Sequence, residues 1–136
     1  MERLTIPVQV DNNLDANSGL LMRLRHVWTP DLRIFEQDGN ELYRWNGYLP
    51  PEEFAAQLLV AIGQARLRRK EFAAAQDLFA EALRRFPTAF VAPEAQYFLA
   101  VSGYRASGES SQLLKGWHRL ETRYPNTEWV AKQDFH

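Results

Sequence analysis

The 136-residue chain contains no cysteine. This absence excludes disulfide cross-links, thiolate nucleophiles, dithiol redox chemistry and sulfur-ligated zinc sites within the chain. The chain also lacks an excess of either charge, because 16 basic and 17 acidic residues leave a net charge of -1. Without a basic field, no nucleic-acid partner is expected.

Long apolar runs are absent too. No run approaches the roughly 20 residues needed to span a bilayer. The amino terminus, Met1-Glu2-Arg3-Leu4, lacks the basic-then-apolar layout of a signal peptide. We therefore expect a cytoplasmic protein with no membrane insertion.

What the chain does contain is enough apolar material for a folded domain. Hydrophobic residues make up 46% and charged residues 24% of the sequence, which is typical of globular proteins. The length fits one ordinary domain, or two half-sized units that share a core. The hydrophobic period changes near Pro50, from two residues before it to a helical period after it.

The first fifty residues show strand and turn patterns. Residues 4–10 alternate between apolar and polar side chains, and Pro7 favours an edge strand there. A short helix follows, with Asp15 or Asn17 as its cap. The runs 32–35 and 41–45 flank Asp38-Gly39, which predicts a β-hairpin.

The residues after Pro50 predict amphipathic helices. Four runs carry the helical period, at residues 51–67, 72–86, 95–104 and 111–124. One offset along the chain aligns Phe86 with Tyr124 and also Phe79 with Trp117. In addition, Phe90-Val91-Ala92 echoes Trp129-Val130-Ala131 with one residue inserted. This internal repeat predicts antiparallel helix pairs that stack on one another.

Residues 56–89 resemble a tetratricopeptide repeat. Small residues stand where two helices would cross, and a proline follows the second helix; the matching positions are Gly63, Ala75, Phe79, Ala82 and Pro87. The second unit is looser and is similar to the variant repeats of bacterial envelope-assembly proteins. The resemblance implies a groove for a protein or peptide partner, lined from the first helix by Gln57, Val60, Gln64, Leu67 and Arg68.

The first fifty residues resemble the later part of a thioredoxin. Val8-Gln9-Val10-Asp11 matches its second strand, Val27-Trp28-Thr29-Pro30 matches the turn with the cis-proline, and residues 34–48 match the closing hairpin. The whole chain resembles a bacterial group in which a thioredoxin domain precedes helical repeats. The first strand, the Cys-x-x-Cys turn and the first helix of that domain have no counterpart in the sequence.

Together these patterns predict an α+β fold. A partial thioredoxin-like β-α-β-β-α unit at residues 1–50 leads into a tetratricopeptide-like array of helical hairpins at residues 51–136, and helix 51–67 is shared between them. The resemblance supports the thioredoxin-like fold and argues against its redox activity.

The predicted function is that of a non-catalytic protein–protein interaction or scaffolding module. Besides the groove, the turn at Trp28, Thr29 and Pro30 is a candidate contact, because a thioredoxin holds extended peptide at this loop. The alternative is that the proline is inherited only to make the turn. A second candidate function is a redox-inactive accessory of a thiol–disulfide system.

Other polar groups of the sequence have structural explanations. Asp11, Asn13, Asp15 and Asn17 alternate as in a calcium loop, but the required glycine and glutamate positions hold Ala16 and Met22. The three histidines are scattered, and the basic run at residues 66–70 suits a helix carboxyl end. We therefore expect no catalytic residues, no metal site and no cofactor.

Self-association is expected from the same resemblance. In a thioredoxin, the strand without a counterpart here lies between the strand that resembles residues 4–10 and the hairpin. Its loss leaves unpaired backbone groups and uncovers Leu32, Ile34 and Leu42, and an open sheet edge invites another chain. The alternative is that the chain's own strand at residues 4–10 slides beside the hairpin. A second copy would also cover the exposed face, so a two-fold homodimer or swapped pair is predicted.

Overall fold

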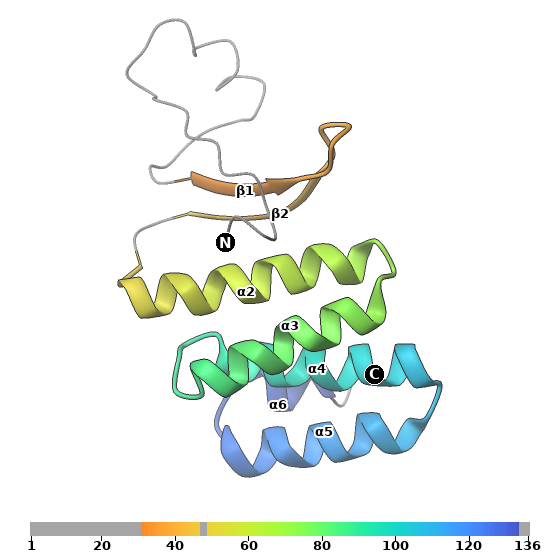
Figure 1. Ribbon diagram of the computed structural model, residues 1–136. Coiled ribbons are helices and arrows are strands. Elements are labelled where there is room, and N and C mark those ends of the chain that lie inside the picture. The colour runs from red at the N-terminus through yellow and green to blue at the C-terminus, as the bar shows by residue number, and fades with distance from the viewer. Residues whose placement is uncertain (1–30, 47–48, 134–136) are drawn as a thin grey trace, which may run out of the picture.

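In the computed structural model, which describes residues 31–46 and 49–133, a β-hairpin lies on a stack of helices (Figure 1). The elements are β1 (Asp31–Phe35), β2 (Glu41–Asn46), α2 (Pro51–Arg68), α3 (Phe72–Arg85), α4 (Ala92–Ser107), α5 (Ser110–Arg123) and α6 (Glu128–Lys132). This mixture of helices with a small two-stranded sheet agrees with the predicted α+β class. The predicted strand at 4–10, the helix after it and the turn at 28–30 lie outside the described residues.

The hairpin forms where the sequence predicts it. β1 and β2 pair antiparallel, with Leu32 opposite Trp45 and Ile34 opposite Tyr43. In the turn, the Asp38 carboxylate accepts a hydrogen bond from the Asn40 backbone N–H at 3.0 Å. Gly39 has a φ of +92°, a conformation that strains residues with a side chain.

One face of the hairpin packs on α2. Tyr43 and Trp45 point the same way because they are two residues apart in a strand. The ring centroids of Trp45 and Phe54 are 6.1 Å apart, and Gln57 Nε2 donates a hydrogen bond to the Tyr43 hydroxyl at 3.2 Å. The strand pairing and these contacts together hold β2 on the amino-terminal half of α2.

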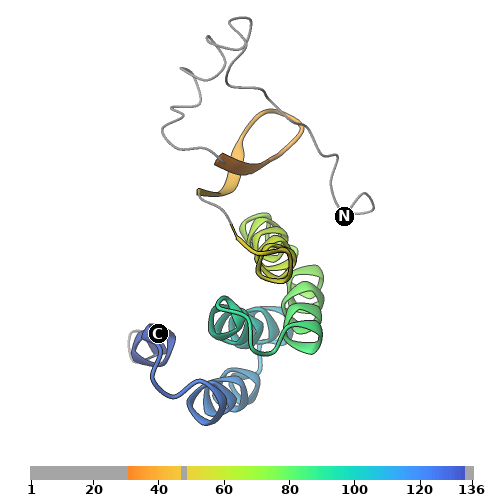
Figure 2. The same cartoon turned by 90° about the vertical axis from the view of Figure 1, so that its left-hand side faces the viewer.

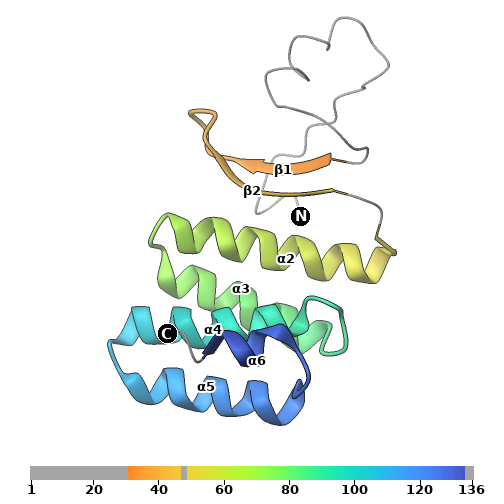
Figure 3. The ribbon, with the colours of Figure 1, turned by 180° about the vertical axis from the view of Figure 1, so that it is seen from behind.

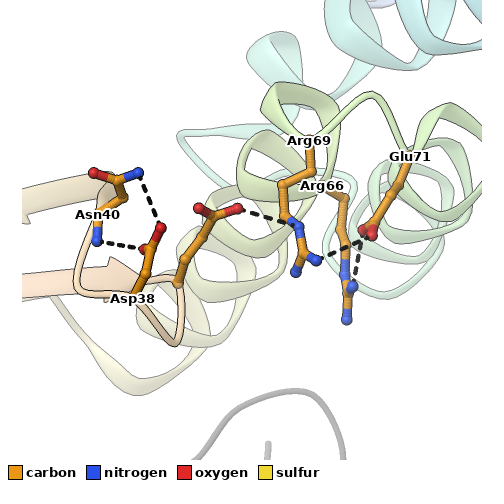
Figure 4. A network of polar contacts seen from close by, with 6 residues as sticks. Asp38, Asn40, Arg66, Arg69 and Glu71 are labelled. Atoms are coloured by element: carbon orange, nitrogen blue, oxygen red, sulfur yellow. Dashed lines mark hydrogen bonds and ion pairs between the residues drawn. The ribbon is translucent and has the colours of Figure 1, made fainter.

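The other end of the hairpin is tied to the α2–α3 connection by charge. Arg69 pairs with Glu36 at 3.3 Å and Arg66 with Glu71 at 2.8 Å, beside the turn that holds Asp38 (Figure 4). The predicted basic run at the end of this helix therefore serves contacts within the chain. The Arg66 guanidinium also holds the pKa of Glu71 below its usual value.

Helices α2 and α3 form one antiparallel pair and α4 and α5 a second, with α4 packed on α3 (Figures 1 and 3). The shared core contains Ala56, Val60, Ala75, Phe79, Ala82, Ala89, Val91 and Ala95. Small residues permit the close crossings. A Cβ atom added to Gly63 would stand 2.7 Å from the Phe79 ring. Ala75 and Ala82 are buried between helices, as their spacing predicts.

Backbone geometry confirms the internal repeat. Phe86 and Tyr124 cap α3 and α5 with nearly the same angles, φ -133° and ψ 59° against φ -133° and ψ 56°. The same offset along the chain relates Lys70 to Gly108. Lys70 follows α2 with a φ of +62°, and Gly108 follows α4 with a φ of +75°. Equivalent residues therefore end equivalent helices in both pairs.

The echo of Phe90-Val91-Ala92 in Trp129-Val130-Ala131 does not extend to the packing of the two aromatic side chains. The repeat aligns Phe90 with Trp129, yet Phe90 is 88% exposed, whereas Trp129 packs with its ring centroid 5.2 Å from that of Tyr97. Phe90 lies in the α3–α4 connection, whereas Trp129 lies within α6. Trp117, predicted as a packing residue, stacks on the buried Tyr97 ring at 6.4 Å.

Candidate functional site

The first helices of the successive pairs follow one another along one side of the stack. α2 contacts α4, and α4 contacts α6, while α3 lies on the opposite side (Figure 2). We call the surface formed by α2, α4 and α6, together with the Tyr43 side of the hairpin, the first-helix face. A binding groove in a helical-repeat protein is expected on such a face.

Of the five predicted groove residues of α2, the structure leaves only Arg68 exposed. Val60 is 0% exposed and belongs to the same buried cluster as Phe79. Gln57 is 9% exposed and is engaged by Tyr43. Leu67 packs partly buried against the core.

The reason is that α2 lies between the hairpin on one side and α3 on the other (Figure 1). Only a narrow strip of the helix stays accessible. Of the predicted set, Gln64 is half-buried and Arg68 is exposed, so the assignment of Val60 to a groove is corrected to a packing role. The second predicted contact, at Trp28, Thr29 and Pro30, lies outside the described residues.

A polar group that the sequence did not single out stands at the centre of the first-helix face. Glu94, in the first turn of α4, has a half-buried side chain. Burial raises the pKa of Glu94 to about 7; Lys132 of α6 acts in the opposite direction, and Glu128 adds to the rise.

Glu94 also acts on the hairpin. The pKa of Tyr43 is raised by burial and, in addition, by the charge of Glu94. Side chains from β2, α2, α4 and α6 thus meet on one face, and we call them the polar cluster: Tyr43, Gln57, Glu94, Glu128 and Lys132.

Of the charged residues in this cluster, Lys132 and Glu128 form an ion pair, and Glu94 is not part of it. Lys132 Nζ lies 3.9 Å from the Glu128 carboxylate and 4.0 Å from the centroid of the Trp129 ring. Among the described residues, no ion pair within 4.0 Å includes Glu94. A half-buried carboxyl group without a cation partner is costly to ionise. Such a group can donate a hydrogen bond when protonated, or bind a cation when ionised.

Sequence reasoning missed Glu94 because its local pattern is ordinary. Pro93-Glu94 in a first helical turn resembles Pro51-Glu52 at the start of α2, where proline and carboxylate suit the helix amino end. Only the fold, which buries Glu94 and brings Glu128 and Lys132 of α6 near it, distinguishes Glu94. No sequence signal near Glu94 marks that arrangement.

A second surface feature is a shallow hollow of about 610 Å³ between the α3–α4 and α5–α6 connections. The exposed Phe90 ring and Arg123 line it, and the Tyr124 hydroxyl donates a hydrogen bond to the Pro87 carbonyl at 2.7 Å. Its walls are largely apolar and bring no cluster of polar groups together.

Within residues 31–46 and 49–133, no group of three or more histidine, aspartate or glutamate side chains is arranged to hold a metal ion. None of the helices in this part of the chain is long and apolar enough to cross a membrane.

Comparison with known families gives one match. Residues 5–62 match the sequence model of the thioredoxin-like domain family, a segment that includes β1 and β2 and ends within α2. This match supports a thioredoxin-like domain in the first part of the chain. No family match confirms the tetratricopeptide-like repeats. No curated protein and no solved structure matches the chain.

Proposed function

We propose that this protein is a non-catalytic interaction module that binds a protein or peptide through the first-helix face. The observation that carries the proposal is Glu94, a half-buried carboxyl group whose charge acts on Tyr43 and is influenced by Glu128 and Lys132 of α6, without an ion pair within 4.0 Å among the described residues. Burying such a group without a partner lowers stability, so a ligand that supplies a partner gains binding energy there.

The chemistry of the face suggests what it binds. A lysine or arginine side chain, or a free amino terminus, would pair with Glu94 and favour its ionised form. The Trp129 ring beside Lys132 adds apolar surface at the α6 edge. The ligand is therefore a peptide segment with a cationic group, laid across α2, α4 and α6.

The non-catalytic part of the proposal rests on the thioredoxin-like match together with the cysteine-free sequence. Reduction or exchange of a disulfide requires attack by a thiolate, and this chain supplies none. The repeated helix pairs and their resemblance to tetratricopeptide repeats support a binding role, because stacked helix pairs present extended surfaces.

A peptide library displayed on phage tests the proposal. Peptides selected on the wild-type protein should be enriched in lysine or arginine. Their affinity should fall at least tenfold for Glu94→Gln, which keeps the shape of the side chain and removes its charge. A matched control is Asp77→Asn on α3, whose exposed carboxylate lies outside the first-helix face. Equal affinity for wild type and Glu94→Gln would contradict the proposal.

A second candidate function is that of a redox-inactive accessory in a thiol–disulfide system. The thioredoxin-like match in a chain without cysteine favours it. Insulin reduction by an added dithiol thioredoxin would be measured with and without this protein. A change in rate supports the accessory role, and an unchanged rate across a tenfold molar excess contradicts it.

A further inference from the structure

The outward side of α5 carries an exposed leucine where the preceding helix pair is covered. In that pair, α4 packs along α3. Arg105 lies 4.7 Å from the centroid of the Phe72 ring, and the Phe98 and Phe79 rings stack at 6.0 Å. A Cβ atom added to Gly103 would stand 3.2 Å from Gln76 Nε2. Along α3, this packing therefore extends from Phe79 to Phe72, which lies in the first turn of α3.

The internal repeat, in which Phe79 is equivalent to Trp117, places Leu114 of α5 at the position of Gln76. α6 begins to cover α5 in the same manner, since Gln133 Nε2 donates a hydrogen bond to Glu121 at 2.6 Å. However, α6 has 5 residues against the 16 of α4. It lies beside only the carboxyl half of α5 (Figure 3), and Leu114 is left 63% exposed.

This arrangement inverts the usual preference of side chains for the interior. The polar Gln76 is half-buried, while the apolar Leu114 at the equivalent position faces solvent. Leu114 is the one aliphatic residue among the large exposed hydrophobics of the described residues. At the same edge, the Gln133 side chain is 8% exposed, and its Oε1 has no hydrogen-bond partner within the described part of the chain. Both features give this edge groups for contact, an exposed apolar side chain and an amide oxygen without a described partner.

The charges around Leu114 indicate what completes this interface. Lys115, His118 and Arg119 are exposed on the same helix, and none of them forms an ion pair with another described residue. The acidic Glu121 is already engaged by Gln133. Two copies of α5 packed about a two-fold axis would bring these like charges together, which disfavours a second copy of this chain.

We propose that the α5 outer face, formed by Leu114, Lys115, His118 and Arg119, binds an acidic amphipathic helix of a partner protein. The partner helix continues the packing that α4 makes on α3. It places small apolar side chains over Leu114, as Gly103 meets Gln76, and carboxylates beside Lys115 and Arg119. This surface is separate from the first-helix face.

Two synthetic helical peptides, each matched in length to α4, test the proposal by fluorescence anisotropy with the full chain. Both carry alanine and leucine on one stripe; the first has glutamate on its flanks, and the second has lysine at the same positions. The acidic peptide should bind the wild-type protein at least tenfold more tightly than the basic one. Leu114→Ser should weaken its binding at least tenfold, and Lys115→Glu should narrow or reverse the charge preference.

Two variants serve as controls. Phe90→Ser removes an exposed apolar side chain elsewhere, and Glu94→Gln removes the central group of the first-helix face; both should bind the acidic peptide as wild type does. Because Leu114 is exposed, its replacement should leave the circular dichroism spectrum and the melting temperature unchanged. The proposal is overturned if the acidic peptide does not bind, or if Leu114→Ser binds it equally well. A dimer that dissociates on Leu114→Ser would also overturn it, since a second copy would then cover the face.

Discussion

Replacing Glu94 by glutamine should make the protein more stable at alkaline pH. Burial raises the pKa of Glu94 from its ordinary value of 4.5 to about 7. Between pH 4.5 and pH 7, the Glu94 carboxyl group keeps its proton in the folded state and loses it in the unfolded state. The stability contributed by this group is therefore fully present below pH 4.5 and is lost as the pH rises through 7.

The magnitude follows from the size of the shift. One pKa unit corresponds to about 1.4 kcal/mol, so the shift from 4.5 to about 7 predicts that ionised Glu94 costs about 3 kcal/mol at pH 8. Glutamine resembles the protonated acid in shape and does not titrate. Glu94→Gln should thus gain about 3 kcal/mol over wild type at pH 8 and match it within about 0.5 kcal/mol at pH 4.5.

Urea denaturation followed by far-ultraviolet circular dichroism at pH 4.5, 6 and 8 measures this difference. Glu52→Gln is the matched control, because Glu52 also lies in a first helical turn but is exposed, and it should leave the pH dependence nearly unchanged. If Glu94→Gln loses as much stability as wild type between pH 4.5 and pH 8, the reasoning about Glu94 is refuted.

Four further predictions test the packing, the helix ends and the chemistry. Ala75→Leu should overpack the α2–α3 crossing and cost about 1–3 kcal/mol in urea denaturation, whereas Gln64→Arg should be nearly neutral; equal midpoints would refute the assigned packing. Lys70→Gly should stabilise the protein by about 0.5–1 kcal/mol, because Lys70 holds a left-handed conformation that glycine adopts without strain; an unchanged or lower midpoint would count against this view. The protein should show no disulfide reductase activity in an insulin-turbidity assay, and sustained turnover by pure protein would contradict that. Light scattering after size exclusion should show a homodimer formed through the hairpin edge, and a folded 15.8 kDa monomer would exclude it.

The elements that the sequence predicts well are those set by local chemistry. Asp38-Gly39 fixes the hairpin turn through backbone conformations that few residues adopt. Pro50-Pro51 and Pro87 mark the start of α2 and the connection after α3, because proline lacks an N–H donor and fixes φ. The predicted helix ends therefore agree with the structure within about three residues.

The candidate site depends on contacts between distant segments, and the sequence predicts it poorly. Val60 has the spacing of a groove residue, but the hairpin and α3 enclose its helix and turn it into core. Glu94 has an ordinary first-turn position, and its raised pKa arises from burial and from the charge of the distant α6 residue Glu128, against the opposing charge of Lys132. Helical period reports which side of a helix is apolar, and not which element will cover it.

A nuclear magnetic resonance titration tests the central claim most directly. The isotope-labelled full chain would be titrated with a selected lysine-containing peptide, and amide shifts would be followed in wild type and Glu94→Gln. The account predicts shifts concentrated at Gln57, Glu94 and Lys132 on the first-helix face, and their loss in the variant. Shifts centred instead on Phe90 or Leu114, or shifts that persist unchanged in Glu94→Gln, would contradict it.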